Sequence, residues 1–223
     1  MGDREVRLAS FRVKRVLRRS GLLPITDSQV PSLVSIVAGA PVSGSWWGHP
    51  AGQLIYQVGE ALESDPELLV VRLWGGKRTL VHRRLWPALA RIGRARAAWQ
   101  MAGLDDLALQ LLQRIERENT GWTDRLPVDF PGGSKEFRSA LHDLDDRLLI
   151  LTRSVHTSSG AHALEVESWA VWSSSTRTPR FSDSVASAES ALEEAALRLA
   201  PGVMPHRVFP WARSKSAANP SNR

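Results

Sequence analysis

The chain has 223 residues and a mass of about 24.6 kDa, which is long enough to bury a core as one large domain or two small ones. Apolar residues make up 43% of it and charged residues 23%, which excludes a wholly disordered chain, a collagen and a coiled-coil rod. The absence of cysteine excludes disulfides, thiolate metal sites and a cysteine nucleophile. No apolar run approaches the roughly 20 residues that cross a bilayer, and the first residues lack the apolar core of a secretory signal. We therefore expect a cytoplasmic protein with no membrane partner.

The positive charge is concentrated in two segments. The whole chain carries 29 Lys and Arg against 23 Asp and Glu, a net charge of +6. Residues 1–19 hold seven basic and two acidic residues, and residues 68–104 hold eight basic residues and no acid. Segregated positive charge is typical of a protein that binds a polyanion, most often nucleic acid. The alternative is that an arginine-rich composition leaves these side chains as solvated or structural groups.

The first third of the chain predicts a basic segment followed by two short helices. Residues 1–21 are expected to be a basic arm or a first basic helix. Residues 22–39 predict a turn and then a helix, with Asp27 or Ser28 as its N-cap. A second helix is expected to open at His49, with Pro50 in its first turn, and to end before residue 65.

A β-hairpin is the clearest local pattern. Residues 68–74 and 77–82 predict two strands, and the Gly75-Gly76 pair between them supplies the positive φ that a two-residue turn needs. Two short helices followed by a hairpin have the order of a winged helix, in which the second helix enters a major groove and the hairpin lies on the backbone. Residues 83–98 predict another helix.

The second half of the sequence repeats this plan. Residues 104–119 and 134–147 predict helices, the latter capped by Ser134, and residues 148–155 and 163–173 predict strands around a polar turn at 157–160. A final amphipathic helix is expected over residues 182–199. The expected fold class is therefore α+β, with two tandem winged-helix-like units made of helices and two hairpins, a C-terminal helix and a disordered tail. The corresponding boundaries are 1–21, 22–103, 104–181, 182–213 and 214–223.

Three strings carry a resemblance to known proteins: SWWGHP at residues 45–50, GKRTLVHRRLWP at 76–87 and HTSSGAH at 156–162. With the two helix-plus-hairpin units, they resemble bacterial tandem winged-helix proteins of unassigned role and, more distantly, the AlkZ-type family of DNA glycosylases, which unhook bulky lesions and crosslinks. The resemblance covers about residues 22–173. The catalytic Gln-x-Gln or Gln-x-Asp of that family is absent, because none of the six glutamines is followed two positions later by Gln or Asp. The resemblance therefore implies the architecture and not the activity.

No residue cluster predicts a specific chemistry. His49, His82, His156 and His162 lack any metal-ligand spacing, and the last two are expected to face each other across a hairpin turn. The acids Asp143, Asp145, Asp146, Glu165 and Glu167 are expected to face water. No phosphate-cradling glycine motif and no serine nucleophile elbow is present. We expect no cofactor and no metal, and the catalytic residues of any enzyme activity stay unknown.

Nine tryptophans against one tyrosine are unusual for this length. Trp46 and Trp47 precede the second expected helix, which opens at His49, and they either fill the core or contact nucleotides. Trp169 and Trp172 are expected on opposite faces of a strand.

These observations predict a nucleic-acid-binding protein, with DNA favoured over RNA. The residues expected to contact phosphate lie on the hairpin and the helix after it: Arg72, Lys77, Arg78, Arg83, Arg84, Arg91 and Arg94. The residues expected to reach base edges lie on the second helix: Gln53, Tyr56 and Gln57. Trp46 and Trp47 complete the set. Two alternatives stay open: a DNA-repair enzyme related to the glycosylases on the same scaffold, and a winged-helix module that binds an acidic protein partner or a second copy of itself.

Overall fold

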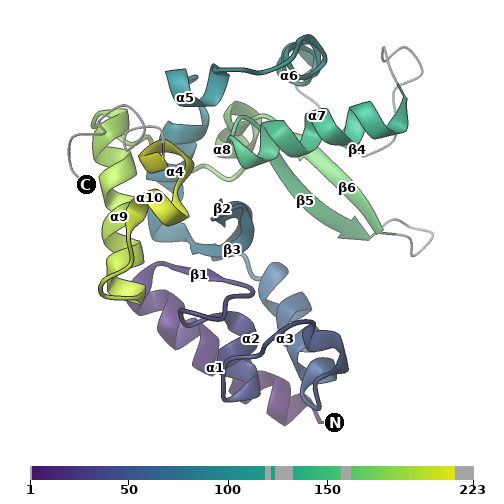
Figure 1. Ribbon diagram of the computed structural model, residues 1–223, viewed down its shortest axis with the longest axis vertical. Coiled ribbons are helices and arrows are strands. Elements are labelled where there is room, and N and C mark those ends of the chain that lie inside the picture. Colours follow the sequence, from purple (N-terminus) through teal and green to yellow (C-terminus); the bar gives the residue numbers. More distant parts are fainter. Residues whose placement is uncertain (1, 119–121, 124–132, 157–161, 214–223) are drawn as a thin grey trace. The chain divides into compact units, whose positions relative to one another are not determined.

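The computed structural model describes residues 2–118, 122–123, 133–156 and 162–213. The protein is of the α+β class, as predicted, with helices, two small antiparallel sheets and a helical C-terminal region (Figure 1). It divides into two compact units. The first unit comprises residues 1–86 and 189–223, and the second unit comprises residues 87–188.

The first unit has the element order of a winged helix. Helix α1 (Asp3–Ser20) is followed by strand β1 (Leu22–Pro24), helices α2 (Leu33–Ala38) and α3 (Gly52–Glu63), and strands β2 (Leu68–Trp74) and β3 (Lys77–His82). The strands form an antiparallel sheet in the order β1-β3-β2, and the three helices pack on one another (Figure 1). The predicted hairpin is confirmed, with φ of +62° and +78° at Gly75 and Gly76.

Helix α1 settles the choice between a basic arm and a basic helix in favour of the helix. It forms because Ala9, Val13 and Leu17 recur at helical spacing and are buried. Its arginines occupy the remaining faces, and it ends at Gly21, whose φ of +97° is the left-handed conformation of a C-cap.

The starts of α2 and α3 differ from the prediction. Asp27 does not cap α2; its carboxylate closes a turn by accepting the N–H groups of Gln29 and Val30 at 2.8 and 3.1 Å. The N-cap is Ser32, whose hydroxyl accepts the N–H of Ser35 at 3.1 Å. Helix α3 begins at Gly52 instead of His49, because a short 3₁₀ helix η1 (Trp46–Gly48) intervenes.

The first unit is completed by residues from the far end of the chain. Helix α10 (Pro205–Val208) follows helix α9 (Val185–Leu199), and the Gly75 N–H at the hairpin tip donates to the Val208 carbonyl at 2.7 Å. Phe209 is fully buried, with its ring edge-to-face on Trp74 at 6.4 Å between centroids. Trp211, also fully buried, stacks on Phe209 at 4.6 Å.

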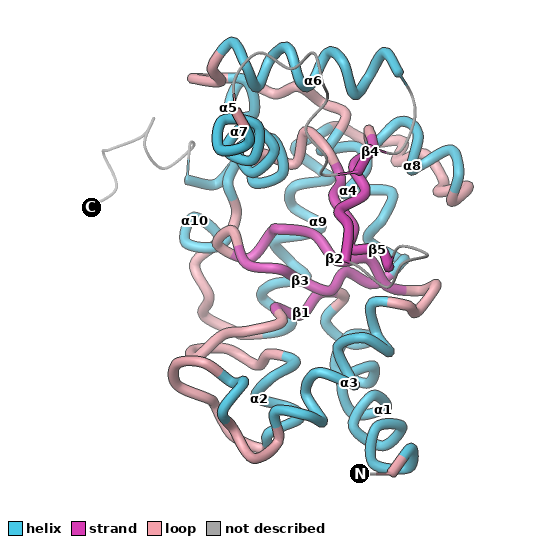
Figure 2. The backbone as a smooth tube through the Cα atoms, turned by 90° about the vertical axis from the view of Figure 1, so that its right-hand side faces the viewer, coloured by secondary structure: helices cyan, strands magenta, loops and turns pink. Residues whose placement is uncertain are grey.

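The second unit repeats the strand order of the first. Its elements follow one another as helix α6 (Asp106–Glu118), strand β4 (Trp122–Thr123), helix α7 (Ser134–Asp146), strand β5 (Leu151–His156) and strand β6 (His162–Glu167). The three strands form a sheet in the order β4-β6-β5. Helices α6 and α7 pack on each other (Figure 2), and both contribute buried residues to one apolar core. The helix predicted over residues 83–98 is shorter than expected: the 3₁₀ helix η2 (Arg83–Leu85) leads into α4 (Trp86–Gly93), and a separate turn, α5 (Ala98–Met101), follows. The N-cap of α7 is Gly133 and not Ser134.

The predicted long strand over residues 163–173 is wrong beyond Glu167. Ser168 accepts the N–H of Val171 at 3.3 Å and starts helix α8 (Trp169–Ser175). Trp169 and Trp172 are consequently both buried and meet edge-to-face at 5.5 Å, instead of lying on opposite faces. The Trp169 indole lies on Gly93 so closely that a Cβ there would meet it at 2.4 Å.

Two carboxylates expected in water are buried. Asp145 is 7% exposed and accepts the Thr152 hydroxyl at 3.0 Å, while Glu167 is 6% exposed. The backbone pairs His156 with His162 as expected. The predicted turn at residues 157–160 and the predicted tail at residues 214–223 lie outside the described residues.

Candidate nucleic-acid interface

The cations of the first hairpin are engaged with carboxylates of the same unit. Lys77 Nζ lies 2.7 Å from Asp27 Oδ2, and Arg78 Nη2 lies 2.9 Å from Glu63 Oε2. Burial acts to raise the pKa of Asp27, but the hydrogen bonds from Lys77 and from two backbone N–H groups outweigh it and hold this pKa below 3.8. Arg72, opposite Arg78 in the strand register, also has an interaction partner. These three cations therefore offer phosphate only part of their formal charge.

Arg83 and Arg84 are adjacent but have different environments. The Arg83 side chain is 63% exposed and lies 3.8 Å from Glu67, a loose ion pair. The Arg84 guanidinium donates to the carbonyls of Arg18 and Arg19 at 2.6 and 2.9 Å, at the C-terminal end of α1. Arg84 thus satisfies carbonyls that the helix itself leaves without partners.

Helix α3 presents polar and aromatic side chains beside an exposed tryptophan. Gln53 and Tyr56 are exposed, and Gln57 is half-buried with its Oε1 atom buried and without a hydrogen-bond partner in the described part of the chain. The Trp46 and Trp47 rings stack at 4.2 Å, and Trp47 lies 5.9 Å from Tyr56. We call Trp46, Trp47 and Tyr56 the aromatic platform.

In the second unit, four arginines line one pocket of about 650 Å³. Arg91 lies in the last turn of α4 and Arg94 directly follows that helix, while Arg177 and Arg180 follow α8. The hydroxyl-bearing residues that share the lining are Ser173, Ser174, Thr178 and Ser182. We call this site the arginine pocket. It gathers donors that suit phosphate oxygens.

The arginine pocket retains an excess of positive charge. Asp183 is the one acidic residue in its lining, and the described parts of the chain give none of the four arginines a carboxylate within ion-pair distance. Arg91 Nε makes a long contact of 3.4 Å with the Asp183 backbone carbonyl. All four arginines are exposed to solvent, so a ligand does not have to break a buried ion pair to reach them.

The backbone around Arg177 has an unusual conformation for an arginine. Helix α8 ends in a pair of hydrogen bonds, from Arg177 N–H to Ser174 O at 3.2 Å and from Thr178 N–H to Ser173 O at 2.9 Å. This end motif places its C′ residue in the left-handed region, where glycine is common. Here that residue is Arg177, with φ of +51°. Left-handed backbone costs a non-glycine residue on the order of 1 kcal/mol, and such strain is concentrated at functional sites.

The sequence predicts half of the arginine pocket. Arg91 and Arg94 belong to the acid-free segment of residues 68–104, whereas Arg177 and Arg180 are not among the predicted contacts. The available signal was the stretch SSSTRTPRFS at residues 173–182, which carries two arginines among hydroxyl residues and no acid.

Glu167 is a buried carboxylate of the second unit whose surroundings shift its pKa. Burial raises its pKa above 4.5, and Arg153, whose Nη2 lies 2.6 Å from Glu167 Oε1, offsets this only in part. Glu167 is not among the residues that line the arginine pocket. The pocket therefore combines cations and hydroxyls without this carboxylate.

His82 is held neutral by its surroundings. Burial, with smaller contributions from Arg84, Arg18 and Arg83, lowers its pKa below 6.5 against the opposing effect of Glu67. Its Nδ1 atom accepts the Arg84 N–H at 3.3 Å, a role that needs the unprotonated ring. No cluster of three or more His, Asp or Glu suited to a metal ion occurs among the described residues.

Comparisons of the chain with protein-family models, with curated proteins and with solved structures find no match. Within the described ranges, no helix is both long and apolar enough to span a membrane.

Proposed function

We propose that this protein binds nucleic acid, with duplex DNA preferred, and that the arginine pocket of the second unit contacts the phosphate backbone. The observation that carries the proposal is the convergence of Arg91, Arg94, Arg177 and Arg180 on one hydroxyl-lined pocket. Arginine binds phosphate oxygens with two parallel N–H donors, and each contact releases a condensed counterion.

Duplex DNA is favoured over RNA because of the first unit. Its two helices followed by a hairpin have the order of proteins that place a helix in a major groove. The major groove of A-form RNA is too deep and narrow for such a helix. Gln53 on the exposed side of α3 carries an amide of the kind that pairs with adenine edges.

The proposal predicts a specific loss of electrostatic binding when the pocket is neutralised. In R94Q/R180Q, glutamine keeps part of each side-chain stem and removes the charge. Binding to labelled duplex DNA, followed by fluorescence anisotropy across a salt series, is expected to weaken for all sequences alike. The slope of log K against log salt is expected to fall by about 2, close to one for each lost phosphate contact.

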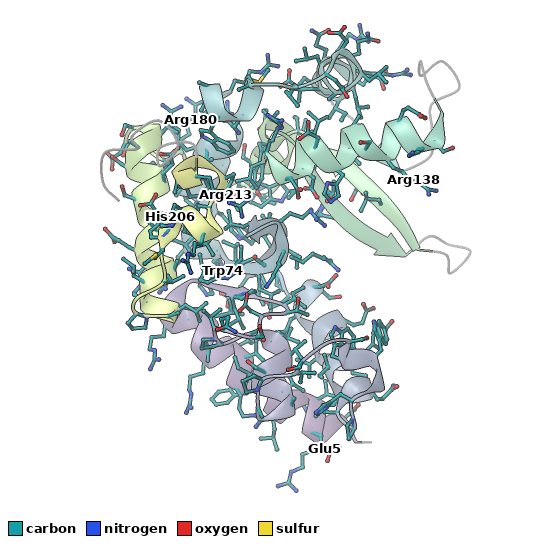
Figure 3. All side chains as sticks on the ribbon, viewed as in Figure 1. Glu5, Trp74, Arg138, Arg180, His206 and Arg213 are labelled. Atoms are coloured by element: carbon teal, nitrogen blue, oxygen red, sulfur yellow. The ribbon has the colours of Figure 1, made fainter. Side chains whose placement is uncertain are left out.

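The matched control is K135Q/R138Q on α7 of the same unit. Both side chains are exposed, and α7 contributes no residue to the pocket lining; Figure 3 shows Arg138 well away from Arg180. This variant removes the same formal charge and is expected to leave the slope nearly unchanged. An equal fall of the salt slope in both variants would show that binding depends only on net charge and not on the pocket. If the unaltered protein did not bind DNA at low salt, the proposed function would be rejected.

A further inference from the structure

We propose that the aromatic platform of the first unit stacks on a single unpaired nucleobase. The protein would then favour DNA that presents an unstacked nucleotide, such as a bulge, over a fully paired duplex. This inference rests on the proposed function, and it concerns residues of the other unit.

The platform exposes one large aromatic side chain to solvent. Trp47 is 67% exposed, although its ring is large and apolar. Trp46 is half-buried and stacks on Trp47, with ring centroids 4.2 Å apart and planes inclined by 22°. An indole supported from behind by a second indole is oriented before a ligand arrives, so stacking requires little further ordering.

The backbone fixes the platform against helix α3. A Cβ at Gly52 would meet the carbonyl oxygens of Trp46 and Trp47 at 3.0 Å, so η1 and the start of α3 are in close contact. The Gly52 N–H donates to the His49 carbonyl at 2.7 Å, and the Ala51 N–H donates to His49 Nδ1 at 3.1 Å. The tryptophans therefore belong to the folded body of the first unit.

Polar groups on the exposed side of α3 suit the edge of a base. Gln53 directly follows Gly52, and Tyr56 lies three residues further on the same side of α3; both are exposed. The Gln53 amide supplies a donor and an acceptor, and the Tyr56 hydroxyl supplies either. A planar ligand with polar edges matches this combination, and a nucleobase is such a ligand.

The geometry does not fit a cation cage. A cage needs rings spaced around an ammonium group, whereas Trp46 and Trp47 are in van der Waals contact and the Tyr56 ring centroid lies only 5.9 Å from that of Trp47. The net charge of +6 also opposes a cationic ligand and favours an anionic one, as every nucleotide is.

The test compares two labelled duplexes that differ only by one unpaired nucleotide. Fluorescence anisotropy is expected to give the unaltered protein about tenfold higher affinity for the bulged duplex, in line with the stacking of one base on an aromatic side chain. W47A is expected to bring the ratio of the two affinities close to one, because it weakens binding to the bulged duplex much more than binding to the paired duplex. With 2-aminopurine at the unpaired position, the protein is expected to quench its fluorescence, and W47A is expected to lose the quenching.

The matched control is L197A, which removes another exposed apolar side chain of the first unit and is expected to keep the tenfold ratio. Equal affinity of the unaltered protein for both duplexes would overturn the platform proposal and leave the proposed function standing. The platform proposal would also be overturned if W47A bound both duplexes more weakly by the same factor. Absence of binding to either duplex would reject the proposed function and this inference together.

Discussion

Glu167 shows how a single buried carboxylate links the fold of the second unit to pH. It is 6% exposed, and its contact with Arg153 is an ion pair without hydrogen-bond geometry. Burial raises the pKa, and the Arg153 charge counteracts the rise only in part. Because the folded-state pKa lies above the unfolded value, the folded state holds this proton to a higher pH. Stability is therefore lost as the pH rises from about 4.5 through the folded-state pKa.

We predict that E167Q stabilises the protein at neutral pH, by an amount on the order of 1 kcal/mol. Glutamine resembles the protonated carboxyl, and Arg153 keeps its ion pair with Glu165, at 3.1 Å. Urea unfolding at a series of pH values is expected to show the gain above the folded-state pKa and its disappearance near pH 4. The control E165Q, on a half-exposed side chain, should not reproduce this pattern; a destabilised E167Q at pH 7 would contradict the prediction.

At the scale of elements, the C-terminal end of α1 depends on a residue far along the chain. Gly21 closes the helix by donating its N–H to the Leu17 carbonyl at 2.7 Å, and Arg84 satisfies the carbonyls of Arg18 and Arg19. The positive charge of Arg84 is also attracted to the partial negative charge at this helix terminus, which stabilises the helix. Arg84 thus connects α1 to the end of the hairpin.

We predict that R84Q lowers the free energy of unfolding by about 1 kcal/mol, the usual net contribution of one hydrogen bond to the stability of a folded protein. R83Q changes the neighbouring arginine, which is 63% exposed and only loosely paired, and is expected to change stability by less than about 0.5 kcal/mol. Chemical denaturation of the two variants provides the comparison. Equal effects would show that the Arg84 hydrogen bonds to α1 contribute nothing.

Elements were predictable where a local pattern decided them. The hairpin at residues 68–82 was found because strand alternation and the two glycines agree. The sequence predicts a strand in place of helix α8 because every second residue from position 164 continues the alternation that a strand shows: Leu164, Val166, Ser168, Ala170 and Trp172. One side-chain hydrogen bond, from Val171 N–H to Ser168 Oγ, starts the helix there, and burial of both tryptophans favours it. Such tertiary burial is not visible in a short sequence window.

The sequence predicts the arginine pocket only in part, because segments far apart in the chain line it. Arg94 and Arg180 line the same pocket although more than eighty residues separate them. The absence of acids from residues 68–104 points to Arg91 and Arg94. No local rule connects that segment to the loop after α8, so the second pair required the fold.

The division into two units predicts separate responses to core damage. Phe209 packs on Trp74 and Trp211 within the first unit. F209A is expected to destabilise that unit by roughly 3–5 kcal/mol. In hydrogen exchange, the amides of β2 and β3 should lose protection, whereas those of α6 and α7 should keep theirs. Equal loss of protection in both units would show that the chain unfolds as one cooperative block.

The hydrogen bond between Gly75 and Val208 has a consequence for biosynthesis. The second unit is a continuous stretch of chain, whereas the first needs residues 189–213 beside its hairpin. On the ribosome, the N-terminal helices and hairpin emerge early, but their sheet cannot gain its final cover until the later segment has been translated. The unit that is begun first is therefore finished last, and during that interval Trp74 lacks the Phe209 ring that packs on it in the folded protein.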